Sequence, residues 1–464
     1  IVADTEIQIA ATTIDVNGNV DVSGTLGLSG DVTLADGADL ITASAGTSNF
    51  RAGVNAGNSI QSGGSYNVVV GDEAGTDITT GDENVGVGFG ALFKLTTGQY
   101  NTAIGSGALD AATDPSYKTA VGFQAGGAVT TGVQNTLIGG QAGDSLTDAD
   151  YNTAVGVSAL GADTKGNRTV ALGFNALASQ NFTSPTNSYN VGVGVSAGAN
   201  VTTGFQNVLI GGLAGDALTD ADYNVAIGYQ ALSGDTLGSR SVALGRIALL
   251  SQNFTSATNA YNIAVGYGTG AQITTGLQNT LIGGLAGDAM TDADNNVVVG
   301  YSALTTNVLG SESVAIGTFA LNAQNPASAT NMYNVAVGHN SGAAVTTGVQ
   351  NTLIGGLAGD ALTDADFNTA IGHLALSSDT LGSRSTAIGM NTLRDQNFTS
   401  ATETYNVAVG HGAGLLVTTG VQNTLIGGLA GDALTSSAGN VAVGYLSLSA
   451  ATTADLNTAI GHRA

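Results

Sequence analysis

Apolar and polar residues alternate in a short phrase that recurs along most of the chain. The phrase reads Asn-[Thr/Val]-[small]-[Ile/Val]-Gly, and one copy is Asn224-Val225-Ala226-Ile227-Gly228. Alternate residues of a strand point to opposite faces, so Val225 and Ile227 share one face and Ala226 lies on the other. We expect the branched pair to be buried and the small residue to let a neighbouring strand or subunit approach. The closing glycine is expected at a corner, with a positive φ.

The closing glycines follow one another with almost constant spacing. Between Gly71 and Gly461 there are 23 copies at steps of 17 residues, but every fourth step from Gly173 onward is 21, so the pattern repeats every 72 residues. A chain of equivalent short turns is a solenoid and not a globule around one core. At about 4.8 Å for each turn, the rod is expected to be on the order of 110 Å long. We therefore predict an all-β fold, a parallel β-solenoid of about 23 turns of 17 or 21 residues.

The position that opens each phrase is filled by asparagine in 18 of the 23 copies. Stacked asparagine side chains can hydrogen-bond along a solenoid and satisfy backbone groups at a corner. Serine and threonine can do the same more weakly. We therefore predict an asparagine ladder with a structural role. The substituted positions are Lys118, Thr169, Ser241, Ser313 and Ser385.

Three segments of different composition divide the chain. Residues 1–34 carry apolar-x-apolar triplets, such as the one at 14–16, at a spacing of six residues with glycine turns between them. Such short strands do not form a stable core within one chain, but several chains wound together can, so we expect a short-strand shaft. Residues 35–65 are rich in Gly and Ser and are expected to be a transition. Residues 66–464 are expected to form the β-solenoid rod with its 72-residue super-repeat.

Composition restricts the classes of function. Of the 464 residues 43% are hydrophobic, and acidic residues outnumber basic ones 34 to 10, which gives a net charge of −24. The apolar share argues against disorder. The negative charge repels nucleic acid and anionic membranes and keeps a long particle soluble. Because there is no cysteine and no long apolar run, we expect neither disulfides nor membrane insertion.

The repeated phrases resemble those of two groups of proteins. The head repeats of trimeric autotransporter adhesins contain Asn-Ser-Val-Ala-Ile-Gly, to which residues 239–245 and 368–372 are similar. Gly-rich tail-fibre proteins of marine bacteriophages contain Asn-Thr-Ala-Ile-Gly, preceded by a segment that resembles 12–26. The resemblance covers nearly the whole chain and implies a left-handed β-roll in each chain, with three chains joined side by side. The steps of 17 and 21 residues exceed the adhesin turn, so additional loop residues must be accommodated.

From the resemblance we expect a structural and adhesive fibre on a virion, a phage tail fibre that extends toward the host cell and attaches to its surface. Its expected partners are itself, as a homotrimer, other virion tail or baseplate proteins, and a glycan or protein of the host surface. Its expected location is the virion surface, outside the cell. The passenger of a bacterial trimeric surface adhesin is the first alternative.

Two further alternatives have less support in the residues. An ice-binding solenoid needs threonines on every turn, but pairs such as Thr202-Thr203 come only once per 72 residues. A polysaccharide-degrading tailspike needs paired carboxylates in an irregular cleft, whereas this repeat is not interrupted to build one. There is also no Ser/His/Asp or Cys/His arrangement for nucleophilic catalysis. We therefore do not expect an enzyme.

An acidic trio recurs in the 72-residue units and is the candidate metal site. Short Asp-rich loops with glycine can supply the oxygen ligands that calcium prefers. Against a calcium site, the trio lacks a glutamate that could bind through both oxygens, and aspartates also cap corners. Calcium is the only cofactor considered. The candidate ligands are Asp216, Asp220 and Asp222 in one unit and Asp288, Asp292 and Asp294 in the next.

The 21-residue steps insert four residues into the segments 179–189, 251–261, 323–333 and 395–405. Loops on rigid scaffolds often carry recognition, and exposed aromatic rings can stack on sugars. The alternative is that these rings lie beneath the loop or clamp a neighbouring subunit. The candidate receptor contacts are Phe182, Phe254, Phe398, Tyr189, Tyr261 and Tyr405.

The position after the closing glycine favours flat rings, such as Phe89 and Tyr229, and it also holds all four histidines. We expect these histidines to stack like the other rings. A single ring at each level supplies too few ligands for a metal ion.

Overall fold

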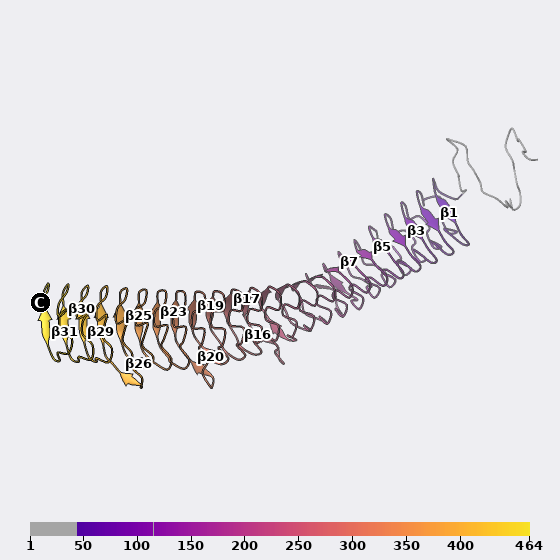
Figure 1. Ribbon diagram of the computed structural model, residues 1–464. Coiled ribbons are helices and arrows are strands. Elements are labelled where there is room, and N and C mark those ends of the chain that lie inside the picture. The colour runs from indigo at the N-terminus through magenta and orange to yellow at the C-terminus, as the bar shows by residue number, and fades with distance from the viewer. Residues whose placement is uncertain (1–43, 115) are drawn as a thin grey trace, which may run out of the picture. The chain divides into compact units, whose positions relative to one another are not determined.

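The computed structural model describes residues 44–114 and 116–464. Ser44–Ala464 form one unit, built as a parallel β-solenoid in which one three-residue strand from each turn joins a 24-stranded sheet. The described residues contain no helix. In Figure 1 the turns follow one another from β1, in indigo, to β32, in yellow. The predicted all-β parallel solenoid is therefore confirmed. Its hand and the homotrimer stay predictions, and the expected shaft over 1–34 lies outside the described residues.

The strands of the large sheet are short and evenly distributed. In the first half they are β1 (Phe50–Ala52), β2 (Val68–Val70), β3 (Val85–Val87), β4 (Thr102–Ile104), β5 (Thr119–Val121), β6 (Thr136–Ile138), β7 (Thr153–Val155), β9 (Val170–Leu172), β11 (Val191–Val193), β12 (Val208–Ile210), β13 (Val225–Ile227) and β15 (Val242–Leu244). In the second half they are β17 (Ile263–Val265), β18 (Thr280–Ile282), β19 (Val297–Val299), β21 (Val314–Ile316), β23 (Val335–Val337), β24 (Thr352–Ile354), β25 (Thr369–Ile371), β27 (Thr386–Ile388), β29 (Val407–Val409), β30 (Thr424–Ile426), β31 (Val441–Val443) and β32 (Thr458–Ile460).

Each strand of the large sheet pairs in parallel with the strand one turn later, in equivalent register. Val225 lies opposite Val242 across a step of 17 residues, and Val242 lies opposite Ile263 across a step of 21. The additional residues of the longer turns therefore leave the sheet unchanged. The sheet begins with β1, which pairs with β2 and lies inside the stretch 35–65 that we expected to be a transition. The solenoid thus starts one turn earlier than the sequence indicated.

The buried and outward sides of the sheet are the reverse of the expected ones. Ala226 is fully buried, whereas Val225 and Ile227 are only partly buried on the outside. The central residue is buried in the same way throughout the large sheet from β2 to β31. The expectation of a buried branched pair was wrong because the interior of one turn is narrow and the opposite wall already fills it. We call the outward side of the large sheet, made of the first and third residues of each strand, the sheet face.

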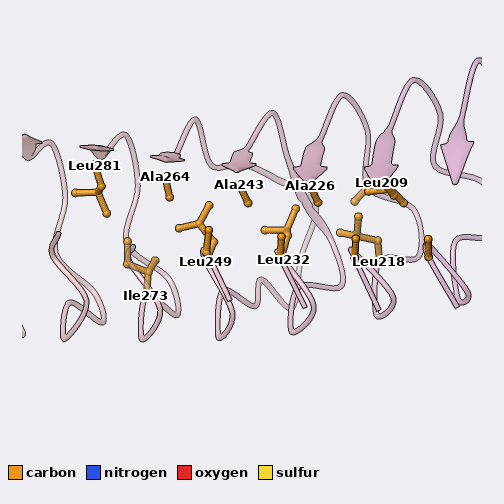
Figure 2. Packing of buried hydrophobic residues seen from close by; sticks show 14 of the residues in the cluster. Leu209, Leu218, Ala226, Leu232, Ala243, Leu249, Ala264, Ile273 and Leu281 are labelled. Atoms are coloured by element: carbon orange, nitrogen blue, oxygen red, sulfur yellow. The ribbon is translucent and has the colours of Figure 1, made fainter. Parts of the chain in front are cut away.

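Large and small residues complement one another across the interior (Figure 2). Ala226 on the sheet faces Leu232 from the opposite wall, and both are fully buried. Where the sheet supplies the larger side chain, as at Leu209, the opposite wall carries Gly215. A Cβ added at Gly215 would lie 2.7 Å from Leu209 and 2.8 Å from Leu218. The volume of each layer is therefore kept constant by exchanging the positions of leucine and a small residue.

The predicted asparagine ladder is confirmed as a buried, hydrogen-bonded column. Asn207 Nδ2 donates to the carbonyl oxygen of Ala221 at 2.8 Å, and Asn207 Oδ1 accepts from the backbone N–H of Asn224 at 2.9 Å. Each side chain therefore satisfies a corner carbonyl and joins its turn to the next. Lys118 interrupts the column: its backbone N–H still donates to Asn101 Oδ1, but its buried amine has no hydrogen-bond partner.

Candidate functional site

Four flaps interrupt the regular turns. We use the word flap for each of the segments 179–189, 251–261, 323–333 and 395–405, which contain the residues added in the 21-residue turns. Each flap carries a two-residue strand that pairs in parallel with the preceding turn, and in Figure 1 β20 and β26 of these pairs lie off the main row of strands. The flaps are therefore anchored, and they recur every four turns, or about 19 Å. The pairs are β8 (Gly166–Asn167) with β10 (Thr186–Asn187), β14 (Gly238–Ser239) with β16 (Thr258–Asn259), β20 (Gly310–Ser311) with β22 (Thr330–Asn331), and β26 (Gly382–Ser383) with β28 (Thr402–Glu403).

A buried polar network holds the base of each flap. In the second flap, Asp235 Oδ2 accepts from Gln252 Nε2 at 2.6 Å, and Asp235 Oδ1 accepts from the backbone N–H groups of Gly238 at 3.0 Å and Phe254 at 3.2 Å. Gln252 Oε1 in turn accepts from Nδ2 of Asn262, a member of the asparagine ladder, at 2.9 Å. Asp235, Gln252 and Asn262 are fully buried. The carboxylate thus replaces a turn of backbone pairing and ties the flap to the ladder.

The third flap uses a different pair of residues for the same purpose. Pro326 takes the place of the phenylalanine and has no backbone N–H to donate. The aspartate is correspondingly replaced by Asn307, whose Nδ2 donates to the carbonyl oxygen of Gly310 at 2.7 Å. Met332 is fully buried, and its Cγ lies 3.0 Å from the position of an added Cβ at Gly310. It therefore fills the space that the phenylalanine ring fills in the other flaps.

The structure separates the aromatic candidates of the flaps into buried and exposed residues. Phe182, Phe254 and Phe398 are only 6%, 6% and 7% exposed. Contrary to the expectation that they contact a receptor, these three rings pack beneath their own flaps, because the space above Gly166, Gly238 and their equivalent is otherwise empty. Tyr189, Tyr261 and Tyr405 are 49–50% exposed and are the aromatic surface that the flaps offer.

Arginine side chains lie between aromatic rings beside three of the flaps. Arg240 Cζ lies 4.6 Å from the centroid of the Tyr223 ring and 6.0 Å from that of Tyr261, within cation–π range. Arg168 and Arg384 are placed in the same way beside the first and fourth flaps. The third flap has a glutamate at this position. The exposed tyrosines are therefore held in fixed orientations by the arginines of the preceding turn.

A polar cavity of about 280 Å³ lies between the fourth flap and the two turns before it. Asp364, Asp366, Arg384 and Glu403 contribute to its lining. Arg384 Nε pairs with Glu403 Oε1 at 3.0 Å, and Tyr405 Oη donates to Glu403 Oε2 at 2.7 Å. The hydrogen bonds from Tyr405 and then Arg384 lower the pKa of Glu403. The cavity therefore presents fixed carboxylates together with one guanidinium group.

The acidic trio is divided between two parts of the turn. Asp220 and Asp222 occupy the repeat positions of the two aspartates that line the fourth-flap cavity, whereas Asp216 lies four residues before Asp220 on another part of the turn. Asp220 Oδ1 accepts from Thr203 Oγ1 at 2.5 Å, and Asp222 Oδ1 accepts from the backbone N–H of Phe205 at 3.0 Å. Burial raises the pKa of the Asp216 and Asp222 carboxyls. The structure thus brings two of the three candidates together with a flap, which the sequence did not indicate.

The second trio shows the same commitment of its carboxylates to neighbouring turns. Asp288 Oδ1 accepts from the Thr305 hydroxyl, Asp292 Oδ1 accepts from Thr275 Oγ1 at 2.6 Å, and Asp294 Oδ1 accepts from a backbone N–H at 2.7 Å. Over residues 44–114 and 116–464, no group of three or more His, Cys, Asp or Glu side chains could hold a metal ion. The described aspartates of the trio are therefore explained as hydrogen-bond acceptors between turns.

The sheet face is apolar along the whole described rod. From β2 to β32 its positions hold only Val, Thr, Ile and Leu. Many of these side chains are substantially exposed, including Leu244 at 41%, Ile282 at 41% and Ile426 at 40%. The face is bordered by the rings that follow the closing glycines, such as Tyr229 and Tyr267, at 47% and 51% exposed. Stacking of a histidine in this column is seen at His462, whose ring centroid lies 5.4 Å from that of Tyr445.

The sequence matches no protein-family model and no curated protein. In the part of the chain that the structure describes, no helix is long and apolar enough to cross a membrane.

Proposed function

We propose that this protein is a structural and adhesive fibre of a bacteriophage virion, which assembles as a homotrimer and attaches to the host cell surface. The observation that carries the proposal is the sheet face, an apolar strip that continues without a charged residue through the strands from β2 to β32. The resemblance of residues 12–26 and of the closing-glycine phrases to phage tail fibres supports the viral assignment.

The size of the sheet face favours association with further copies of the chain. A strip about 110 Å long and about 10 Å wide has an area on the order of 1,000 Å². Soluble monomers rarely expose contiguous apolar patches above a few hundred Å². A partner that covers the whole strip must match its length and its turn spacing, which a second copy of the same rod does. Three copies around one axis would each cover their sheet faces and leave the flaps at the periphery.

The flaps suit attachment through many weak contacts. Four anchored flaps at intervals of about 19 Å repeat their exposed tyrosine along one chain, and association multiplies their number. Repeated weak contacts on a rigid support raise the overall affinity without any single strong site. The partners expected beyond the fibre itself are a glycan or protein of the host surface and other tail or baseplate proteins of the virion.

Assembly can be tested by measuring the mass of the full chain in solution by sedimentation velocity and light scattering. We expect a species of three times the 45.4 kDa chain mass. The double variant Ile282→Glu/Ile354→Glu places charges on the sheet face and should shift the protein toward monomer. Gln141→Glu adds a charge at an exposed corner outside the sheet face and should not. A stable wild-type monomer would contradict the homotrimer.

Attachment can be tested with fluorescently labelled full chain and a panel of whole bacterial isolates. We expect saturable binding to some isolates, and loss of binding after periodate oxidation of surface sugars if the receptor is a glycan. Binding that persists after periodate but is lost after protease treatment would identify a protein receptor. Failure to bind any isolate while trimers form would contradict the adhesive role and leave only the structural one.

A further inference from the structure

A groove near the start of the described rod is formed by two glycines in successive turns. The second position after the closing glycine holds Glu73, Gly90, Gly107 and Gln124 in four consecutive turns, all with φ between 52° and 67°. A Cβ at Gly90 would meet nothing within 4 Å, and one at Gly107 would only touch Gln124 at 3.5 Å. No other described turns carry glycine at this position twice in succession. The missing side chains open a cavity of about 230 Å³.

Phenylalanine rings form the walls of the groove. Phe89 and Phe123 each follow a closing glycine, lie two turns apart and are 60% and 57% exposed. Two turns correspond to about 10 Å, and the residue between them is the small Ser106. Phe93 lines the same cavity from the next part of the turn. The rings therefore leave between them a gap with apolar sides and a floor of glycine backbone.

Polar groups surround these rings. Glu73, Asp110, Gln124 and Ser106 also line the cavity, so that two carboxylates, one amide and one hydroxyl lie near its phenylalanines. Apolar walls with a small number of polar groups are typical of small-molecule sites. A pyranose ring presents C–H groups on its faces and hydroxyls around its edge, and it matches both parts of this lining.

We propose that this groove binds one neutral pyranose ring of a surface saccharide, an assignment that rests on the attachment role proposed above. The C–H face of the sugar packs against Phe89 or Phe123, and its hydroxyls hydrogen-bond to the carboxylates and amide at the edge. A cavity of about 230 Å³ is smaller than the pockets that hold drug-sized ligands, so it holds one ring of a longer chain. The two carboxylates and the net charge of −24 disfavour anionic sugars.

The test uses the full chain and a variant that fills the groove without new backbone strain. Gly90→Gln/Gly107→Gln introduces the residue that the same column already carries at Gln124, Gln141 and Gln230, with φ between 52° and 57°. Wild-type protein is first screened on an array of neutral, amino and anionic saccharides, and the best neutral saccharide is then titrated calorimetrically. We expect the filled variant and Phe89→Ala each to bind this saccharide about tenfold more weakly or less. Phe174→Ala removes a ring of the same column where no such groove exists, and it should bind like the wild type.

Several results would overturn the assignment. These are absence of any neutral saccharide among the ligands of the wild type, a preference for anionic saccharides, unchanged binding by the filled variant, or an equal loss in Phe174→Ala. A change in sedimenting mass of the filled variant would show that the groove is instead a contact between copies of the chain. Attachment to cells is measured in parallel with the same variants. If the filled variant still attaches while neutral saccharides do not bind the wild type, the groove assignment fails and the adhesive role stands. If the wild type attaches to no cells, the adhesive role fails whatever the array shows.

Discussion

Among single residues, the closing glycine is required by the turn that follows it. The expected positive φ is confirmed, and it is 133° at Gly228. A Cβ at this position would lie 2.5 Å from the carbonyl oxygen of Gly245. The equivalent distance from Gly105 to the oxygen of Gly122 is 2.2 Å. Because both contact partners belong to paired backbone, neither can move aside without breaking the sheet register.

Substitution of one closing glycine should therefore destabilise the rod. We expect Gly228→Ala to lower the free energy of unfolding by roughly 2 kcal/mol or more, since the added methyl group meets backbone and not a flexible side chain. Gly140→Ala is the matched control: a Cβ there would meet nothing within 4 Å, and its φ is not in the left-handed region. Chemical denaturation of both variants measures the difference. Equal effects would show that the contact between turns is not the reason for the glycine.

The buried amine of Lys118 makes a prediction about pH. Burial lowers the pKa of Lys118 from 10.5 to about 7, opposed by the charge of Asp150. Between these two pH values the unfolded chain binds more protons than the folded one, so the stability contributed by this residue rises with pH. Relative to Lys118→Asn, the wild type should be least stable below about pH 7 and should gain stability up to about pH 10.5.

The measurement is the free energy of unfolding of the wild type and Lys118→Asn at several pH values between these limits. Lys118→Asn should be the more stable protein at neutral pH, since it restores an asparagine to the ladder and removes the buried amine. The difference should narrow as the pH rises. A difference that is independent of pH would show that the amine is not desolvated in the folded protein.

Within a flap, the aspartate and the phenylalanine act as one unit. Asp235 Oδ1 accepts from the backbone N–H of Phe254, whereas Asn307 accompanies Pro326, which has no N–H. The third flap therefore shows that the two positions change together. A carboxylate that loses a buried donor is costly, while an amide at the same place can donate to a carbonyl oxygen instead.

This pairing predicts a measurable coupling. Phe254→Pro should destabilise the protein, and adding Asp235→Asn should recover part of the loss, with an interaction energy of about 1 kcal/mol in a double-mutant cycle. Asp235→Asn combined with Phe398→Pro, in a distant flap, is the control and should be additive. Additivity in both pairs would show that the network is not shared between the carboxylate and the flap backbone.

For the whole molecule, the 72-residue unit should be removable without loss of the fold. Deletion of residues 213–284 joins Gly212 to Leu285, which reproduces the natural Gly284-Leu285 sequence and keeps every column in register. Since stability of a solenoid is approximately a sum over neighbouring turns, the shortened protein should fold and unfold cooperatively. Small-angle scattering should show a rod about 19 Å shorter.

Deletion of residues 213–276 is the control, because it removes a length that is not a whole number of turns. It shifts the asparagine ladder and the closing glycines out of register after the junction. We expect loss of cooperative unfolding and of protection from hydrogen exchange near the junction. Equal stability of the two deletions would contradict a structure in which each turn depends on its neighbours.

The spacing of the glycines and asparagines was enough to predict the turn, the parallel sheet and the ladder. These features repeat locally, so each copy confirms the others, and only the first turn at β1 was missed because its step from Gly53 to Gly71 is irregular. The sequence also contained a signal for the buried side of the sheet. Asn224 and Ala226 are two residues apart and share a face, so a buried ladder requires a buried Ala226 and an outward Val225 and Ile227.

Only the tertiary structure decided how wide the interior is and which segments meet. Ala226 lies inside because Leu232, six residues later, already fills the layer. Phe254 lies beneath its flap, and the aspartates of one turn meet a flap from two turns later, because the chain returns to the same place at every circuit. The sequence determined the length and order of the circuits through local spacing. The use of each surface depends on packing across the circuit, which brings together residues that the repeat keeps apart along the chain.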